Sequence, residues 1–386
     1  MNRCATFLSV FLSSSLFAQT SRPFYQADEL KQLMHRVADF QIRAYGNTAS
    51  TNWQAAPFWT GVLADYKATG DESFYQAAKK WAEATQWKLD RRTFHADDMA
   101  VGQAYLEMYM RGKQPQMIAD VQSRFEQYLT RQTVTHAEVE HGPASAAFVG
   151  RNVWWWCDAL FMAPPAMARM SAASGDKRYL DLMHSLYWDT TAYLFDQSEG
   201  LFFRDDSYFF DKRKSPSGKK IFWSRGNGWV YGGLIRTLDY IPKDDPKRQQ
   251  YVDLFKKMTD VLVKYQGEDG MWRTSLNEAT WLTTPESSGT GFFCFGMLAG
   301  VNRGYLDRKT YLPVALKAWA GLCSIVTAEG AVEYAQPVGA APVAPVVGSF
   351  KEYSQGAFLM AASEIYTMQL STEEVSLLNS FKPEVK

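Results

Sequence analysis

Apolar and amphipathic stretches alternate along the chain. In 163–191, the first part is rich in small and apolar residues on every side. The second part carries Tyr179, Leu182, Met183 and Leu186 at the spacing of one helix face. A helix that is apolar all round is buried, whereas a helix with one apolar stripe covers a core. The stretch therefore predicts a helical hairpin with one inner and one outer helix.

The same hairpin pattern recurs about six times, and later copies start roughly 65 residues apart. The N-terminal helix is expected to complete the last copy. Buried helices ringed by amphipathic ones predict an all-α (α/α)6 barrel, a six-hairpin toroid, formed by residues 19–386 as one domain. The alternative, an open helical solenoid, would need a polar capping repeat at each end, and no such repeat is evident. The matching stretches are 57–85, 95–112, 163–191, 227–262, 290–326 and 354–368.

Irregular sequence separates the hairpins, at 140–152, 196–222, 266–288 and 328–352. In a toroid such loops gather at one mouth of the barrel, where a functional site is expected. The Pro/Gly/Ala-rich stretch at 335–350 predicts an extended loop rather than a boundary between domains.

The composition narrows the class of protein. Of the 386 residues, 46% are hydrophobic, which excludes a disordered chain. The 41 Lys and Arg residues balance 41 Asp and Glu residues, so the net charge does not indicate a nucleic-acid-binding protein. The 13 Trp, 20 Tyr and 24 Phe residues fit a core, and they also fit a cleft that stacks flat ligands such as sugar rings.

The N-terminus has the pattern of a secretory signal peptide. Arg3 precedes a short apolar and serine-rich run over 5–17, and Ala18 is suitable as the last residue before cleavage. This run is too short to span a bilayer, and no later segment is long and apolar enough to be a membrane span. Residues 1–18 are therefore predicted to be removed during secretion across the inner membrane into the periplasm.

Three cysteines remain after this segment: Cys157, Cys294 and Cys323. Their spacing contains no CxxC pair and gives neither a disulfide framework nor a zinc site. Buried free thiols are the favoured interpretation, and one disulfide bridge is the alternative in an oxidising compartment. The five histidines are too scattered to predict a metal site, and the sequence predicts no cofactor.

Two acidic stretches are candidates for proton transfer. Asp158 stands where an inner helix should begin, directly after three consecutive tryptophans, at 154–156. A helix N-terminus favours the ionised carboxylate and an apolar setting the protonated acid, so the residue is either an ordinary N-cap or a proton donor. Asp97 and Asp98 also precede a predicted inner helix; one is expected to cap it, and the other could couple to Asp158. His95 is the only histidine beside these candidates.

The stretch 222–233 combines Arg225 with glycines and with two tryptophans, Trp223 and Trp229. Arginine offers a planar fork to a carboxylate, and tryptophan offers a stacking surface. The alternative is a glycine-rich helix start with a surface arginine. The two glycines here are no dinucleotide fingerprint, because no strand precedes them.

Two further loops contain polar candidates. Ser288 and Thr290 open another inner helix and either cap it or bond ligand hydroxyls. Arg204 and Asp205 lie in a predicted mouth loop, where they either have a structural role or bind a ligand.

Taken together, these motifs resemble glycoside hydrolase family 105, the unsaturated rhamnogalacturonyl and glucuronyl hydrolases, which are related to family 88. The resemblance covers residues 25–370 and implies an (α/α)6-barrel catalytic domain. The segments that carry it are WWWCDALFMAPPAMARM, FWSRGNGWVYGGLIRTLDYIP, PESSGTGFFCFGMLAG and YSQGAFLMAASEIY.

The resemblance implies roles for individual residues. Asp158 matches the general acid/base, and Asp97, five residues before Gly102, matches the second active-site aspartate better than Asp98 does. Residues that match positions around the unsaturated sugar are Trp156, Trp223, Arg225 and Trp229. Family members often carry a histidine shortly before the aspartate motif and another in a loop like 200–206. In this chain the first position falls within 146–152, and Arg204 stands near the second.

The implied substrate is an oligosaccharide left by a polysaccharide lyase, with a 4,5-unsaturated uronic acid at its nonreducing end. Asp158 would protonate carbon 4 of the vinyl ether, and water would then add at carbon 5, without hydrolytic attack at carbon 1. Arg225 is the candidate for binding the uronate carboxylate or adjacent hydroxyls. Two alternatives stay open: a conventional inverting glycosidase using Asp97 and Asp158, and a non-catalytic periplasmic glycan-binding protein.

Overall fold

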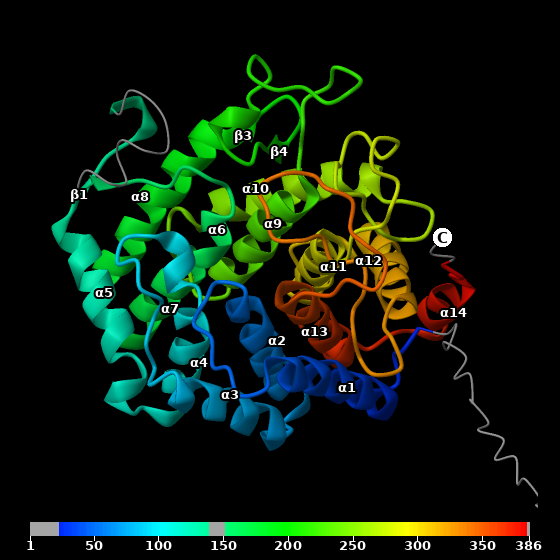
Figure 1. Cartoon of the computed structure of the whole chain (residues 1–386), viewed down its shortest axis with the longest axis horizontal. Coiled ribbons are helices and arrows are strands. Elements are labelled where there is room, and N and C mark those ends of the chain that lie inside the picture. Colours follow the sequence, from blue (N-terminus) through cyan, green and yellow to red (C-terminus); the bar gives the residue numbers. More distant parts are fainter. Residues whose placement is uncertain (1–22, 139–150, 384–386) are drawn as a thin grey trace, which may run out of the picture.

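Six helices form a closed inner ring in which each contacts the next and the last contacts the first (Figure 1). The computed structural model describes residues 23–138 and 151–383. The predicted signal peptide and most of the loop at 140–152 therefore lie outside the described residues. In ring order the inner helices are α2 (Ala55–Thr69), α4 (Gly102–Gly112), α7 (Pro164–Ser174), α9 (Ser224–Leu238), α11 (Ser287–Asn302) and α13 (Glu352–Thr367).

A second layer of helices surrounds this ring. The N-terminal helix α1 packs on α13, as expected for the completion of the last hairpin, and the other outer helices follow the inner ones in sequence. Closure of the ring confirms the predicted (α/α)6 toroid and excludes the open solenoid. The outer helices are α1 (Ala27–Tyr45), α3 (Glu72–Ala84), α5 (Ala119–Thr130), α8 (Lys177–Leu194), α10 (Arg248–Leu262) and α12 (Arg308–Ser324).

Short elements complete the described part of the chain. The two-stranded pairs β1–β2 and β3–β4 are parallel and antiparallel, respectively, and α14 packs on α12. These elements are α6 (Ala159–Met162), α14 (Thr372–Ser380), β1 (Gln132–Thr133), β2 (Arg151–Asn152), β3 (Phe195–Asp196), β4 (Leu201–Phe202), η1 (Ala96–Met99), η2 (Pro115–Met117), η3 (His136–Glu138), η4 (Asp206–Tyr208) and η5 (Val263–Tyr265).

The two layers follow from the hydrophobic pattern. Every residue of α9 is buried, whereas α10 buries one stripe that includes Tyr251, Phe255 and Met258. Small residues let the inner helices approach closely. A Cβ at Gly356 of α13 would lie 2.2 Å from the carbonyl oxygen of Pro57 in α2, so no larger residue fits at this crossing.

The loops that precede the inner helices are linked to one another at one mouth of the barrel. Isolated β-bridges join Trp156 to Asp205 and Trp223 to Ser275. The amide of Ser287 donates to the carbonyl oxygen of Tyr334 over 3.0 Å. For the predicted loops at 196–222, 266–288 and 328–352, these links confirm that they gather at one end, the end at which the inner helices begin.

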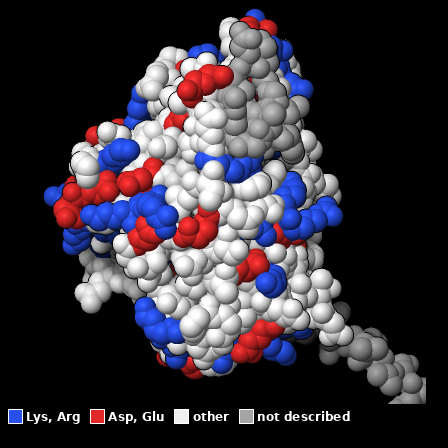
Figure 2. All heavy atoms as spheres, turned by 90° about the vertical axis from the view of Figure 1, so that its left-hand side faces the viewer, with Lys and Arg blue, Asp and Glu red and all other residues white. Residues whose placement is uncertain are grey.

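The surface and the cysteines agree with the composition. On the face shown in Figure 2, Lys and Arg side chains lie among Asp and Glu rather than forming a broad basic surface. Within the described ranges, the helices include none with the length and apolar content of a membrane span. Cys157, Cys294 and Cys323 are buried and free, as the favoured interpretation predicted.

Candidate active site

Asp158 lies at the mouth of the barrel, immediately before the short helix α6. The sequence suggested that an aspartate here could cap a long inner helix, but its backbone is already helical and its side chain makes no capping hydrogen bond. The helix is short because Pro164, at the start of α7, cannot continue the hydrogen bonding of α6. The carboxylate is therefore available for other contacts. Its side chain is 11% exposed.

The structure separates Asp97 from its neighbour Asp98. Asp98 is fully buried and accepts hydrogen bonds from Arg92, at 2.9 Å from Nε and 2.6 Å from the backbone amide. Asp97 is 19% exposed and accepts a hydrogen bond from the indole Nε1 of Trp156 over 3.3 Å. Asp98 thus fixes the loop, and Asp97 faces the segment that carries Asp158, as the resemblance implied.

The expectation that one of these aspartates caps the helix is wrong. They belong to the 3-10 turn η1, whose N-cap is His95, and α4 begins only at Gly102. Nδ1 of His95 accepts from the amide of Asp97 over 3.3 Å, and its ring packs on Trp156 at 4.6 Å between centroids. Burial lowers the pKa of His95 to about 4, so the imidazole is neutral at pH 7.

The two carboxyl groups interact electrostatically. Burial, and then the charge of Asp158, raise the pKa of Asp97 to about 7. Burial also raises the pKa of Asp158, while Arg204 and Arg225 act against this shift. The pair therefore holds one proton near neutral pH, which is the condition for a general acid that also acts as a base.

Arg204 lies directly beside Asp158. Its Nε is 3.4 Å from Oδ2 of Asp158, and its Nη1 donates to Asp205 over 2.6 Å. The amide of Cys157 donates to the carbonyl oxygen of Arg204 over 2.9 Å. The loop at 200–206 is thereby joined to the aspartate motif and holds a cation next to the acid.

Arg225 lies buried beneath a loop rather than at the surface of the mouth. The side chain is fully buried, and its Nη1 and Nη2 donate to the carbonyl oxygens of Gln336 and Pro337 over 3.1 and 2.8 Å. Because these donors are committed to the loop at 335–350, the geometry does not favour the expectation that Arg225 binds the uronate carboxylate or adjacent hydroxyls, which stays a prediction. Its charge still acts on Asp158.

The two tryptophans of the same motif are also buried. Trp223 donates from Nε1 to Oε1 of Gln336 over 2.7 Å. Trp229 is fully buried in the barrel core, with its ring centroid 4.6 Å from that of Phe292 and 4.9 Å from that of Phe161. Burial assigns Trp229 to packing and Trp223 to holding the loop, rather than to an open stacking surface.

Ser288 and Thr290 are satisfied within α11. The N-cap of this helix is the buried Glu286, whose carboxylate accepts from the amides of Ser288 and Gly289. The hydroxyl of Thr290 donates to the carbonyl oxygen of Glu286 over 2.6 Å. Neither hydroxyl residue is the cap, and neither is exposed to a ligand.

The solvent-reachable members of the predicted set form one group at the mouth: His95, Asp97, Trp156, Asp158 and Arg204. Gln336, which no sequence pattern singles out, accepts hydrogen bonds from Trp223, Arg225 and Tyr353. Its position in a Pro/Gly/Ala-rich loop gave no signal of this role. Among the described residues, no group of three or more His, Cys, Asp and Glu side chains could hold a metal ion.

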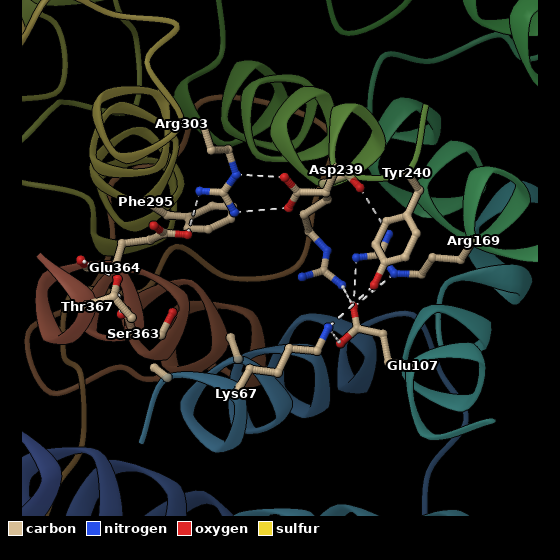
Figure 3. A pocket seen from close by; sticks show the side chains of 13 residues that line it. Lys67, Glu107, Arg169, Asp239, Tyr240, Phe295, Arg303, Ser363, Glu364 and Thr367 are labelled. Atoms are coloured by element: carbon tan, nitrogen blue, oxygen red, sulfur yellow. Dashed lines mark hydrogen bonds and ion pairs between the residues drawn. The ribbon is translucent and has the colours of Figure 1, made fainter. Parts of the chain in front are cut away.

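A charged cavity of about 460 Å³ lies at the other end of the barrel, among the C-terminal turns of the inner helices (Figure 3). The carboxylate of Glu107 is contacted by Lys67, Arg169 and Arg236 at 2.7–3.0 Å. Cations are favourable here because the last carbonyls of a helix carry partial negative charge. The side chains pair with one another, so this end serves to join the helices.

Comparisons with known proteins agree with the geometry. The family model described as Glycosyl Hydrolase Family 88 matches residues 26–369. An unsaturated 3S-rhamnoglycuronyl hydrolase of Formosa agariphila is 37% identical over 325 residues, or 83% of this chain and 86% of that protein. A protein of the same name from Alteromonas sp. (strain LOR) is 34% identical over 353 residues, covering 87% and 85%.

A solved structure described as a glycosyl hydrolase family 88 protein from Bacteroides vulgatus has a TM-score of 0.79 at 28% identity. The match covers 88% of this chain and 99% of that one. The resemblance inferred from the motifs is thereby confirmed, and the chain belongs to Glycosyl Hydrolase Family 88.

Proposed function

We propose that the protein is an exo-acting hydrolase that removes a 4,5-unsaturated uronic acid from the nonreducing end of lyase-generated oligosaccharides. The observation that carries this proposal is the placement of Asp158 and Asp97 at the mouth, with Arg204 beside Asp158 and Trp156 bonded to Asp97. Burial raises the pKa of both carboxyl groups. A reaction that begins with protonation of a carbon needs an acid that retains its proton. The names of the relatives from Formosa agariphila and Alteromonas support the same reaction class.

The proposed mechanism uses Asp158 twice. Its protonated carboxyl gives the proton to carbon 4 of the vinyl ether, which leaves an oxocarbenium-like centre at carbon 5. The resulting carboxylate then takes a proton from water as the water oxygen bonds to carbon 5. The hemiketal opens to a ketone at carbon 5, and the hemiacetal left at carbon 1 releases the rest of the oligosaccharide. Asp158 is protonated again at the end of the cycle.

Asp97 has a supporting role in this proposal. Its charge and that of Asp158 disfavour simultaneous ionisation, so one proton stays on the pair. The hydrogen bond from Trp156 and the packing of His95 hold the Asp97 carboxyl in place. We infer that Asp97 orients water or sugar hydroxyls and adjusts the proton affinity of Asp158.

The names of the relatives indicate a substrate class for the proposed activity. Both are named as rhamnoglycuronyl hydrolases, so we propose an unsaturated uronic acid linked to rhamnose as the preferred substrate. The test is a panel of lyase-generated oligosaccharides, followed by the loss of ultraviolet absorbance of the double bond. We expect the fastest loss with rhamnose-linked substrates. Binding without any loss of absorbance across the panel would instead support a glycan-binding protein.

The activity is expected to decline as the pH rises through about 7. Above this pH the Asp97–Asp158 pair loses its remaining proton, and the acid needed for carbon 4 is no longer present. His95 is neutral throughout this range and does not contribute. The check is the pH profile of kcat/KM on an unsaturated disaccharide. A profile that stays flat up to pH 9 would contradict this assignment.

We also propose that the protein is exported to the periplasm. The basis is the signal-like pattern of residues 1–18, with Arg3 before the apolar run and Ala18 at its end. Intact-mass analysis of the protein recovered from cells is expected to place the mature N-terminus at Gln19. An unprocessed N-terminus on the recovered protein would contradict export by this route.

A further inference from the structure

We propose that Arg204 binds the carboxylate of the unsaturated uronic acid. In doing so, Arg204 forms an ion pair with the substrate and stabilises the ionised form of Asp158 less. This inference rests on the proposed function and adds the residue that recognises the acid group. It assigns to Arg204 the contact that the sequence had suggested for Arg225.

The Nε side of the Arg204 guanidinium faces Asp158 without a hydrogen bond. Among the residues that the structure describes, Nη1 is bonded to Asp205, whereas Nε makes no hydrogen bond and lies 3.4 Å from Oδ2 of Asp158 in an ion pair. A buried donor without a partner is costly and calls for an explanation. Nε and Nη2 form the side of the guanidinium that binds a carboxylate through two parallel hydrogen bonds. The side chain is 25% exposed, so a ligand can reach it.

The guanidinium is also held in position before any ligand arrives. Its ion pair with Asp205 measures 2.6 Å, and the Asp205 backbone forms a β-bridge with Trp156. The carbonyl oxygen of Arg204 accepts from the amide of Cys157 over 2.9 Å. A fixed arginine binds a carboxylate with little loss of side-chain freedom.

The other two arginines near the acid are buried or paired, although Nε of the fully buried Arg225 also lacks a hydrogen-bond partner. Arg225 is fully buried and donates from both Nη atoms to loop carbonyls. Arg92 is committed to Asp98 through Nε and Nη2. Arg204 therefore offers donors for an anionic ligand beside Asp158.

The position of Arg204 suits the chemistry. The substrate carboxylate is attached to carbon 5, and carbon 4, which receives the proton, is the neighbouring ring atom. Since Nε of Arg204 lies 3.4 Å from Oδ2 of Asp158, a carboxylate held on this side of the guanidinium places carbon 4 near the acid. Binding thus supplies both recognition and alignment.

Substrate binding also changes the charge around Asp158. Arg204 and Arg225 act on Asp158, whose carboxyl the Cys157 thiol contacts, and Asp158, Arg92 and Asp98 act on its partner Asp97. A substrate carboxylate bound to Arg204 adds a negative charge next to Asp158. It also pairs with the positive charge of Arg204, which then stabilises the Asp158 carboxylate less. Both effects favour the protonated form of Asp158. The acid is therefore formed preferentially when substrate is present.

The experiment compares Arg204→Gln with the native protein on two substrates, one with the free uronate and one with its methyl ester. We expect Arg204→Gln to lower kcat/KM for the free acid by about 10- to 100-fold, as for a lost hydrogen bond to a charged group. For the ester, the variant and the native protein should differ by less than about threefold, because the charged partner is absent from both. Arg204→Lys should recover part of the loss on the free acid.

A matched control is Arg213→Gln, in the same loop, whose guanidinium lies 4.6 Å from the centre of the Tyr208 ring. It should leave activity on both substrates unchanged. Equal losses on acid and ester by Arg204→Gln would overturn the inference and leave Arg204 with a structural role. Native protein that consumes neither substrate would instead contradict the proposed function.

A binding measurement covers the case in which the ester reacts too slowly to compare. In an Asp158→Asn background, calorimetry with the free-acid disaccharide should show about 10-fold or more weaker binding when Arg204→Gln is added. Unchanged affinity would overturn the inference, provided that the melting temperature shows both variants to be folded.

Discussion

Asp158→Asn is expected to lower kcat by about 10²- to 10⁴-fold, because the amide can neither give a proton to carbon 4 nor take one from water. The substitution keeps the size of the side chain, and the native carboxylate caps no helix. Stability should therefore change little. Substrate should still bind, and its ultraviolet absorbance should persist in the complex. The measurement is the rate of absorbance loss at saturating substrate, together with the melting temperature.

Asp239→Asn is a suitable control for this variant. Asp239 pairs with Arg303 beside the cavity at the opposite end of the barrel, at 2.6 Å (Figure 3). Activity should stay at the native level, since this carboxylate takes no part in the proposed reaction. Native-like activity of Asp158→Asn would show that another group supplies the proton, and Asp97 would then be the first candidate.

The second large effect is expected on stability. Glu107→Ala should lower the free energy of unfolding by about 3–5 kcal/mol, because it leaves Lys67, Arg169 and Arg236 beside one another without their shared carboxylate. The Glu107 side chain is 3% exposed, and its oxygens lie 2.7 Å from Arg169 and 2.8 Å from Lys67. Denaturant unfolding at pH 7 measures the difference. A loss below about 1 kcal/mol would show that these three ion pairs contribute no more than ordinary surface ion pairs.

The pH dependence of this effect has a definite sign. Burial alone would raise the pKa of Glu107, but the charges of Lys67, Arg169 and Arg236 hold it well below the usual 4.5. A carboxylate with a lowered pKa contributes stability above its unfolded-state value, and this contribution is lost as the pH falls below about 4.5. The gap between the native protein and Glu107→Ala should therefore narrow in acid. Glu72→Gln, which breaks an exposed pair with Arg111, should change the melting temperature little.

The fold could be predicted because it depends on patterns that act over short stretches. Apolar-all-round and one-sided helices identify the inner and outer layers, and Gly/Pro-rich stretches identify the mouth loops. The capping details could not be predicted from local sequence. Glu286 rather than Ser288 caps α11, and His95 rather than an aspartate caps η1. In both cases the choice depends on how the preceding loop enters the helix.

The part of the site that depends on local motifs could be predicted from the sequence. Asp97, Trp156 and Asp158 interact as the motifs suggested. Residue type alone could not tell which arginine is open to a ligand. Arg225 satisfies carbonyls of a loop more than 100 positions later in the chain, through contacts centred on Gln336. Such long-range pairing leaves no local pattern, so the difference between Arg225 and Arg204 required the folded chain.

The most direct test of the proposed reaction uses two oligosaccharides that differ only in the bond between carbons 4 and 5 of the terminal uronic acid. The account predicts that the native protein releases this residue from the unsaturated compound, with loss of ultraviolet absorbance, and leaves the saturated compound intact. Release from both compounds at similar rates would contradict it, because cleavage would then proceed by attack at carbon 1, as in an inverting glycosidase.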